Sequence, residues 1–349
     1  MKKTIVLGAL AALSLCAAPA LAQDLPKTDL QVVGGFSNLT AYQQHEQPFW
    51  TKTVPELSKG QVQARIKGLN EMGLKGPELL RLMGQGVIQF GTAPLSYFAA
   101  DDPINEAVDL AGISPDAKTA RAVTEAFIPV YAQHYSKRGN VKLLGVSTYP
   151  AQVLFCNGEI KGLADIKGKK VRTAGRTQSE FVQALGGSSV TMAFGEVVPA
   201  LQNKVVDCAI TGSLSGYSAK WYEVSSHLYA LPISWSQVLH AVNQKTWDGF
   251  SPALQSFLQT HIDKLMDDIW DAAARETQEG YDCNSGAAAC PYEAKGHMTL
   301  VQPSEADREL LRRITVETTL PKWAQRCSDQ CVADFNATIG QVIGLTASK

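Results

Sequence analysis

The sequence lacks an excess of charge of either sign, with 32 basic and 33 acidic side chains and a formal net charge of −1. A balance so close to zero gives no reason to expect nucleic acid or an anionic membrane surface as a partner. Long apolar runs are also missing after the N-terminus, where no segment reaches the ~20 apolar residues that a membrane span needs. These absences predict a soluble protein that binds no nucleic acid.

Complete catalytic and cofactor motifs are missing too. Gly212–Gly216 has the glycine spacing of a nucleophile elbow, but Leu214 stands where the serine belongs. Gly162–Gly168 resembles a phosphate-binding loop, yet it has one residue too many, and Lys170 replaces the hydroxyl that holds magnesium. The histidines are scattered singly, so no metal cluster is indicated. We therefore expect no enzymatic activity, no cofactor and no bound metal.

The N-terminus has the features of a secretion signal. Lys2 and Lys3 give it a positive start, an apolar run follows from Ile5 to Cys16, and Ala20–Ala22 supplies the small residues of a cleavage site. The apolar run is too short to span a bilayer. Residues 1–22 are therefore predicted to be a signal peptide that is cleaved after Ala22, which places the mature protein in the periplasm.

The cysteines that remain after this cleavage are even in number, which favours disulfides in an exported chain. Cys283 and Cys290 enclose a loop of small residues that could close easily. Cys327 and Cys331 lie four residues apart, a spacing that would strain a bridge within a regular helix, so pairing across to the first two is an alternative. A four-cysteine zinc site is a further alternative, although the paired Cys-x-x-Cys spacing is absent. The six cysteines are Cys156, Cys208, Cys283, Cys290, Cys327 and Cys331.

Strand-like and helical segments alternate along most of the chain. Leu30–Val33, Val87–Thr92 and Val141–Ser147 have the apolar pattern of strands. A long helix is predicted between the last two, from about Asp116 to Ser136. Further short strands are predicted at Gln152–Cys156, Val171–Thr173, Ser189–Met192, Val205–Ile210 and Val238–Asn243. Such alternation is typical of sheets covered by helices.

After Asn243 the pattern becomes wholly helical, with a long stretch from Pro252 to about Tyr281 and a final block from Ser304 to Ile343. The mature chain is also longer than a single hydrophobic core usually supports. The order of segments therefore predicts two α/β lobes that are connected by long helices.

Residues 163–207 carry the most specific pattern in the chain. Leu163–Arg172 leads a strand into the turn Thr173–Gly175, and Ala184–Gly187, Phe194–Val197 and Ala200–Asp207 follow. This series resembles the substrate-binding proteins of tripartite ATP-independent periplasmic (TRAP) transporters, the DctP family named for C4-dicarboxylate uptake. The resemblance extends over the whole mature chain.

The resemblance implies a fold and a partner. The fold would be that of an α/β, two-lobed periplasmic binding protein (type II-like), with mixed sheets flanked by helices and one long helix spanning both lobes. Lobe I would comprise residues 23–147 plus about 235–275, and lobe II residues 148–234 plus about 276–349, with hinge strands near Ser147 and Ile233. A monomer would close on a small organic carboxylate and deliver it to integral-membrane TRAP transporter subunits.

Three other functions are alternatives at this stage. A binding protein of an ATP-driven (ABC) importer would have a similar architecture and a different membrane partner. A periplasmic enzyme with an unrecognised site and a ligand-sensing adaptor for a receptor are the other two.

One arginine is predicted to bind the ligand. In the family that the chain resembles, the arginine closing the Lys-x-Arg-type strand holds the ligand carboxylate, and Arg172 occupies that position. The chemistry is favourable in its own right, because a guanidinium keeps its charge when dehydrated and offers two parallel donors to a carboxylate. The alternative is a solvated basic surface that Arg172 shares with Lys167, Lys169 and Lys170.

Two departures from the family pattern bear on the ligand. A second arginine of some members falls near Gln152 here, and Thr211 replaces an asparagine that often lies four residues after the position of Asp207. Both departures argue against a C4-dicarboxylate or sialic acid. Aromatic residues near the predicted cleft, such as Tyr97 and Tyr149, favour a 2-oxo or aromatic acid. Besides Arg172, the predicted ligand-binding residues are Gln152, Thr211, Phe194, Glu196, Thr92, Ser96, Asn38, Tyr42, Tyr217 and Trp235.

Overall fold

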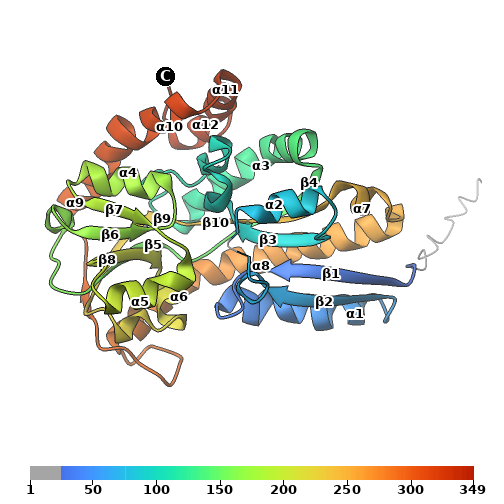
Figure 1. Ribbon diagram of the computed structural model, residues 1–349, viewed down its shortest axis with the longest axis horizontal. Coiled ribbons are helices and arrows are strands. Elements are labelled where there is room, and N and C mark those ends of the chain that lie inside the picture. The colour runs from blue at the N-terminus through green and yellow to red at the C-terminus, as the bar shows by residue number, and fades with distance from the viewer. Residues whose placement is uncertain (1–24, 75) are drawn as a thin grey trace, which may run out of the picture.

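The computed structural model describes residues 25–74 and 76–349, which form two α/β lobes (Figure 1). The predicted cleavage site after Ala22 lies outside these residues. Lobe I is built on a five-stranded sheet of order β2-β1-β3-β10-β4, in which β1 runs parallel to β2 and β3 while β10 runs antiparallel to β3 and β4. Its strands are β1 (Thr28–Gly34), β2 (Val62–Gly68), β3 (Phe90–Pro94), β4 (Val141–Thr148) and β10 (Gln237–Asn243).

Lobe II is built on a six-stranded mixed sheet of order β11-β9-β5-β8-β6-β7. Its strands are β5 (Gln152–Cys156), β6 (Lys170–Thr173), β7 (Ser188–Thr191), β8 (Cys208–Gly212), β9 (His227–Ser234) and β11 (Thr299–Val301). Helices α4 (Arg176–Ala184), α5 (Val197–Gln202) and α6 (Ser213–Ser218) flank this sheet. Two lobes with mixed sheets and flanking helices confirm the predicted fold class.

Apolar side chains cover both faces of the lobe I sheet. On one face, Phe127 and Tyr131 of α3 (Ala117–Gly139) pack with α2 (Glu78–Gly84) in one buried cluster. On the other face, Trp50 of the helical segment 41–57 packs against Phe90 of β3. That segment comprises η1 (Ala41–Glu46), η2 (Phe49–Thr53) and α1 (Val54–Leu57), and the short α7 (Gln244–Asp248) follows β10. The sheet is therefore buried between two helical layers, as its apolar strands require.

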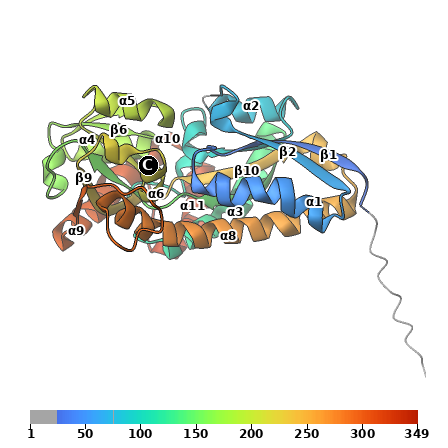
Figure 2. The ribbon, with the colours of Figure 1, turned by 90° about the horizontal axis from the view of Figure 1, so that it is seen from below.

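The long helix α8 (Pro252–Ser285) spans both lobes, as predicted (Figure 2). Ser251 caps its first turn, since its hydroxyl accepts a hydrogen bond from the Leu254 backbone N–H at 3.3 Å. Leu258 packs in the core of lobe I, whereas Gly280 lies against lobe II. A β-carbon at Gly280 would lie 2.3 Å from the Leu214 backbone nitrogen, so only glycine permits this close approach to α6. Among the described residues, no helix is long and apolar enough to cross a membrane.

The C-terminal helices divide between the lobes. They are α9 (Glu305–Ile314), η9 (Thr315–Thr319), α10 (Leu320–Arg326), α11 (Asp329–Ala337) and α12 (Ile339–Ile343). Leu311 of α9 packs in the lobe II core, but Trp323 and Phe335 are buried in the core of lobe I. The assignment of all residues after 276 to lobe II is therefore wrong for residues 320–347, because the apolar faces of α10, α11 and α12 are buried with α3.

The six cysteines form three disulfides, Cys156–Cys208, Cys283–Cys290 and Cys327–Cys331. Pairing of the last two cysteines across to Cys283 and Cys290, and a four-cysteine zinc site, are both wrong. The helix ends before Cys327, whose backbone is extended at φ −76 and ψ 154, and Ser328 begins the next helix by accepting a hydrogen bond from the Cys331 N–H. The two cysteines thus do not lie in one regular helix, which removes the objection raised by their spacing.

Removing Cys156–Cys208 is expected to cost the most stability of the three disulfides. The bridge joins directly opposed residues of β5 and β8 and closes a separation of 52 residues, so its loss should lower the free energy of unfolding by about 4 kcal/mol. Cys156→Ala with Cys208→Ala tests this by urea denaturation. Removal of Cys283–Cys290, which closes a separation of 7, should cost about 2 kcal/mol. Equal losses would contradict the expectation.

Candidate functional site

Strand β6 carries Arg172 into the interior of lobe II. The strand lies between β7 and β8, where Arg172 pairs with Val190 on one side and Ala209 on the other. The preceding Val171 faces the hydrophobic core, so alternation turns Arg172 to the opposite face of the sheet. The side chain is only 2% exposed. The alternative of a solvated basic surface is therefore excluded for Arg172.

Backbone carbonyl groups hold the Arg172 guanidinium in place. Nη1 donates to the Ile210 carbonyl at 2.7 Å, while Nε and Nη2 donate to the Met192 carbonyl at 3.1 and 2.9 Å. The Trp221 ring lies 6.0 Å from the guanidinium carbon. A guanidinium has five N–H donors, and the two that remain form no hydrogen bond with any residue that the structure describes. Arg172 is thus oriented in advance, with donors left for a ligand.

No carboxylate within the described chain neutralises this guanidinium by an ion pair. Burial lowers the pKa of Arg172 to about 10, and the electrostatic effects of Tyr97 and Glu196 only partly offset that burial. The side chain therefore stays positively charged at neutral pH. A buried cation without a counter-charge is unfavourable, and an anionic ligand would remove that cost.

Arg172 lines a cavity of about 350 Å³ that both lobes and a hinge enclose. Lobe I and the chain leaving β4 contribute Phe36, Leu39, Pro94, Ser96, Tyr97 and Tyr149. Lobe II contributes Gln152, Arg172, Ala174, Phe194, Thr211 and Ser215, and the hinge contributes Ser236. Arg172 is the one charged residue in this lining, so the cavity combines a single fixed positive charge with aromatic surfaces and neutral hydrogen-bonding groups.

The two lobes touch at the edge of the cavity. The rings of Phe36 from lobe I and Phe194 from lobe II have their centroids 5.4 Å apart. A β-carbon at Gly175 of lobe II would lie 3.1 Å from the Ser96 β-carbon of lobe I. The described conformation is therefore the closed one.

Two hydroxyl groups in the cavity wall lack well-formed hydrogen bonds. The Ser96 hydroxyl oxygen is buried and has no partner among the described residues, and the Tyr149 hydroxyl has none of normal geometry. Burial raises the pKa of Tyr149, and the nearby Phe36 amide only partly offsets this. Buried polar groups are rarely left without a partner, so both hydroxyls are suited to contact a ligand.

Five of the eleven residues predicted to bind the ligand come together around Arg172. They are Gln152, Thr211, Phe194, Ser96 and Arg172 itself. Glu196 lies in a wider outer cleft of about 1310 Å³ that shares Ser96 and Tyr97 with the inner cavity. The lining thus comes from segments that are far apart in the sequence, as a site between two lobes requires.

The other five predicted residues do not line this cavity. Asn38 is exposed, and Tyr42 is buried against Gly34. The Thr92 hydroxyl shares a hydrogen bond with the buried His240 ring at 3.2 Å. Tyr217 stacks on Tyr222 and Tyr292, away from the cavity. The backbone of Trp235 belongs to the hinge, and its indole N–H donates to the Ser114 carbonyl at 3.0 Å.

The lining also contains residues outside the predicted set, among them the two serines Ser215 and Ser236. Ser215 lies in α6, directly after strand β8. Ser236 lies in the two-residue connection between β9 and β10 and has a positive φ of 53. A strand end is a common place for binding residues, which was a usable signal for Ser215. Ser236 had no comparable signal, since the residue pattern did not predict where β9 ends.

The comparison with known families agrees with this geometry. The family model described as bacterial extracellular solute-binding protein, family 7 (DctP), matches residues 37–310. The chain belongs to this family. Solute-binding receptors of this kind have the two-lobed architecture seen here, and the resemblance drawn from residues 163–207 is confirmed.

Individual relatives of this DctP-family protein are distant in sequence. The 2,3-diketo-L-gulonate-binding periplasmic protein YiaO of Escherichia coli is 23% identical over 209 residues, which cover 59% of this chain and 60% of YiaO. DctP6, a Bordetella pertussis extracytoplasmic solute receptor binding pyroglutamic acid, has a TM-score of 0.79 and 21% identity over 91% of this chain and all of that one. A TRAP solute-binding protein from Desulfovibrio salexigens with bound orotic acid has a TM-score of 0.79 and 18% identity, covering 90% and 99%.

Proposed function

We propose that this protein is a periplasmic receptor that captures a small organic monocarboxylate and delivers it, chemically unchanged, to the membrane subunits of a TRAP transporter. The observation that carries the proposal is Arg172, a buried cation with no carboxylate partner among the described residues and with donors left unused. A carboxylate supplies both the missing charge and two parallel acceptors. The protein is expected to act as a monomer.

The ligands named for similar proteins support an acid of this size. Diketogulonate, pyroglutamic acid and orotic acid each have one carboxylate on a compact polar body. The cavity that Arg172 lines is small and therefore favours a compact ligand. The similarity to solved TRAP solute-binding proteins also supports a TRAP-type membrane partner. The N-terminal signal supports a periplasmic location.

The single cation argues for a monocarboxylate over a C4-dicarboxylate. At the position of a second family arginine, Gln152 donates its side-chain N–H to the Pro150 carbonyl at 2.9 Å. A second carboxylate would therefore be buried without a counter-charge, which is costly. The rings of Phe36, Phe194 and Tyr97 provide flat apolar surfaces for a planar 2-oxo or aromatic acid.

Capture would proceed by closure of the two lobes. The chain crosses between them at residues 149–151 and 235–236, close to the predicted hinges. The Asp109 carboxylate accepts hydrogen bonds from the Trp235 and Ser236 backbone N–H groups at 2.7 and 3.0 Å and so holds the second crossing in place. A ligand that contacts both lobes binds the closed form more tightly and shifts the population toward it.

A thermal-shift panel of organic acids tests this function. Compact monocarboxylates that fit the cavity should raise the melting temperature by about 5 °C at a concentration about 100 times Kd, because only the folded protein binds them. C4-dicarboxylates should leave it unchanged. Stabilisation by dicarboxylates alone would contradict the monocarboxylate assignment. Recovery of the bound acid unaltered after long incubation tests the absence of catalysis.

A further inference from the structure

A second contact between the lobes lies outside the cavity and is ionic. Arg326, the last residue of α10, contacts Glu106 of the short helix η5 (Pro103–Glu106) and Glu180 of α4. Its Nη2 donates to Glu106 at 2.7 Å, its Nη1 donates to Glu180 Oε1, and its Nη2 also lies 3.5 Å from Glu180 Oε2. None of these three residues is part of the cavity lining.

The two carboxylates belong to different lobes. Arg326 is anchored in lobe I, since the neighbouring Trp323 is buried in that core and donates its indole N–H to the Pro103 carbonyl at 2.8 Å. The pair with Glu106 therefore stays within lobe I. Glu180 lies beside Phe181, which is buried in the core of lobe II. The pair of Arg326 with Glu180 thus crosses from one lobe to the other.

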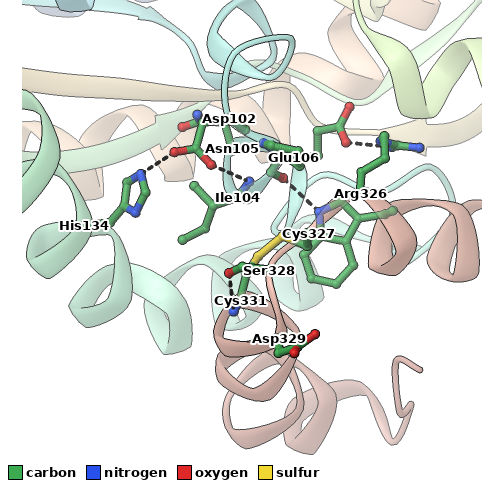
Figure 3. Close-up of a disulfide and its surroundings, with 12 residues drawn as sticks. Asp102, Ile104, Asn105, Glu106, His134, Arg326, Cys327, Ser328, Asp329 and Cys331 are labelled. Carbon is green, nitrogen blue, oxygen red and sulfur yellow. Dashed lines mark hydrogen bonds and ion pairs between the residues drawn. A yellow bond between two sulfur atoms is a disulfide. The ribbon is translucent and has the colours of Figure 1, made fainter. Parts of the chain in front are cut away.

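A disulfide fixes the position of Arg326 (Figure 3). Cys327 ends the helix directly after Arg326 and is bonded to Cys331 in the next helix. Ser328, between them, caps that helix through its hydroxyl. The loop that follows Arg326 is therefore constrained at both ends, which reduces the conformational entropy lost when Arg326 forms its ion pair.

We propose that Arg326 and Glu180 form an interlobe latch that raises ligand affinity by stabilising the closed conformation; this rests on the receptor function proposed above. Their side chains are 18% and 9% exposed, so solvent screens the pair less than a surface ion pair. Arg326 Nε and Glu106 Oε1 are buried without partners among the described residues. The network is thus incompletely satisfied, which allows the latch to open again.

Disulfide trapping tests the latch without any ligand. Ser96 of lobe I and Gly175 of lobe II lie close together in this closed conformation, so cysteine side chains at the two positions would meet. The extended backbone of Gly175 accepts a side chain. In a protein with Ser96→Cys and Gly175→Cys, oxidised glutathione should form the new bridge only when the lobes close. The rate, measured by peptide mass spectrometry, therefore reports how often closure occurs, even if the closed state is rare.

In that background, Arg326→Gln and Glu180→Gln should each slow trapping about fivefold or more, and the double variant should be no slower than the slower single one. Glu106→Gln is the matched control, because it removes a partner of Arg326 within lobe I. Its trapping rate should stay within about twofold of the rate in the parent double-cysteine protein. Arg326→Lys should restore part of the rate. Equal rates in all variants, or an equal loss in Glu106→Gln, would overturn the latch.

Salt provides a second measurement that does not depend on the folding of any latch variant. Raising ionic strength should slow trapping in the protein with Arg326 and Glu180 intact, because the ion pair retains some solvent exposure. A rate that is independent of salt would overturn the proposal. Since no acid is present, the result is separate from the thermal-shift panel that tests the receptor function.

Discussion

Replacing Arg172 by lysine is expected to weaken binding of the captured acid by about 100-fold, or about 3 kcal/mol. Lysine keeps the positive charge but provides neither the planar fork nor the hydrogen bonds to the Ile210 and Met192 carbonyls that orient it. Isothermal titration calorimetry with the acid that gives the largest thermal shift measures the loss. Lys170→Ala, at an exposed residue of the same strand, should bind like the wild type.

Lysine is a better test than alanine because Arg172 also supports the fold. Arg172→Ala would leave two backbone carbonyls of lobe II without their donors and would open space beside Trp221. We therefore expect the alanine variant to lose stability as well as affinity, so that the two effects would be mixed. Wild-type affinity in the lysine variant would show that the carboxylate is bound elsewhere.

The central part of the site could be predicted because it is local in sequence. Residues 163–207 run through β6, α4, β7 and α5 without a break, so one recognisable pattern places both Arg172 and Phe194. The opposite wall comes from lobe I segments at the ends of β1 and β3 and from the two crossings of the chain between the lobes. Ser236 reaches the cavity only because β9 and β10 lie in different sheets, which depends on strand order and not on any local pattern.

The strand errors have identifiable physical causes. The residue pattern did not predict β9 because Pro232 interrupts its apolar run, and only the family resemblance implied a hinge strand near Ile233; β11 was missed because it has only three residues. Strands β3 and β8 begin later than predicted, at Phe90 and Cys208. The apolar residues counted at their predicted starts, Val87 and Val205, are 69% and 52% exposed and lie in turns. Apolar character alone does not show whether a side chain is buried.

The C-terminal block shows a similar limit. Its helical period was correct, but the period does not say which lobe receives each apolar face. Arg326 acquires its interlobe position only because α9 packs on lobe II while α10 packs on lobe I. The contact of Arg326 with both lobes therefore could not be predicted from residues 304–343 alone.

The free energy of unfolding is expected to fall by several kcal/mol between about pH 4 and about pH 7, since each unit of pKa shift corresponds to about 1.4 kcal/mol. Burial raises the pKa of Glu46, Asp109 and Glu276 to about 7 in the folded protein. In the unfolded chain these carboxyls have ordinary pKa values near 4. Between these limits the folded state binds more protons, so raising the pH removes stability. Urea denaturation at several pH values measures the slope.

Glu46→Gln should flatten that slope, because it removes one of the three carboxyls and keeps the shape of the side chain. Among the described residues Glu46 accepts one hydrogen bond, from the Gly35 backbone N–H at 2.8 Å, which a glutamine carbonyl can also accept. Asp109 is less suitable, since both of its oxygens accept backbone N–H groups and an amide would place a donor against one of them. The exposed Glu56→Gln should leave the slope unchanged. Stability that rises with pH across this interval would mean that these carboxyls are ionised within the fold, and the hinge at Asp109 would then hold a buried negative charge.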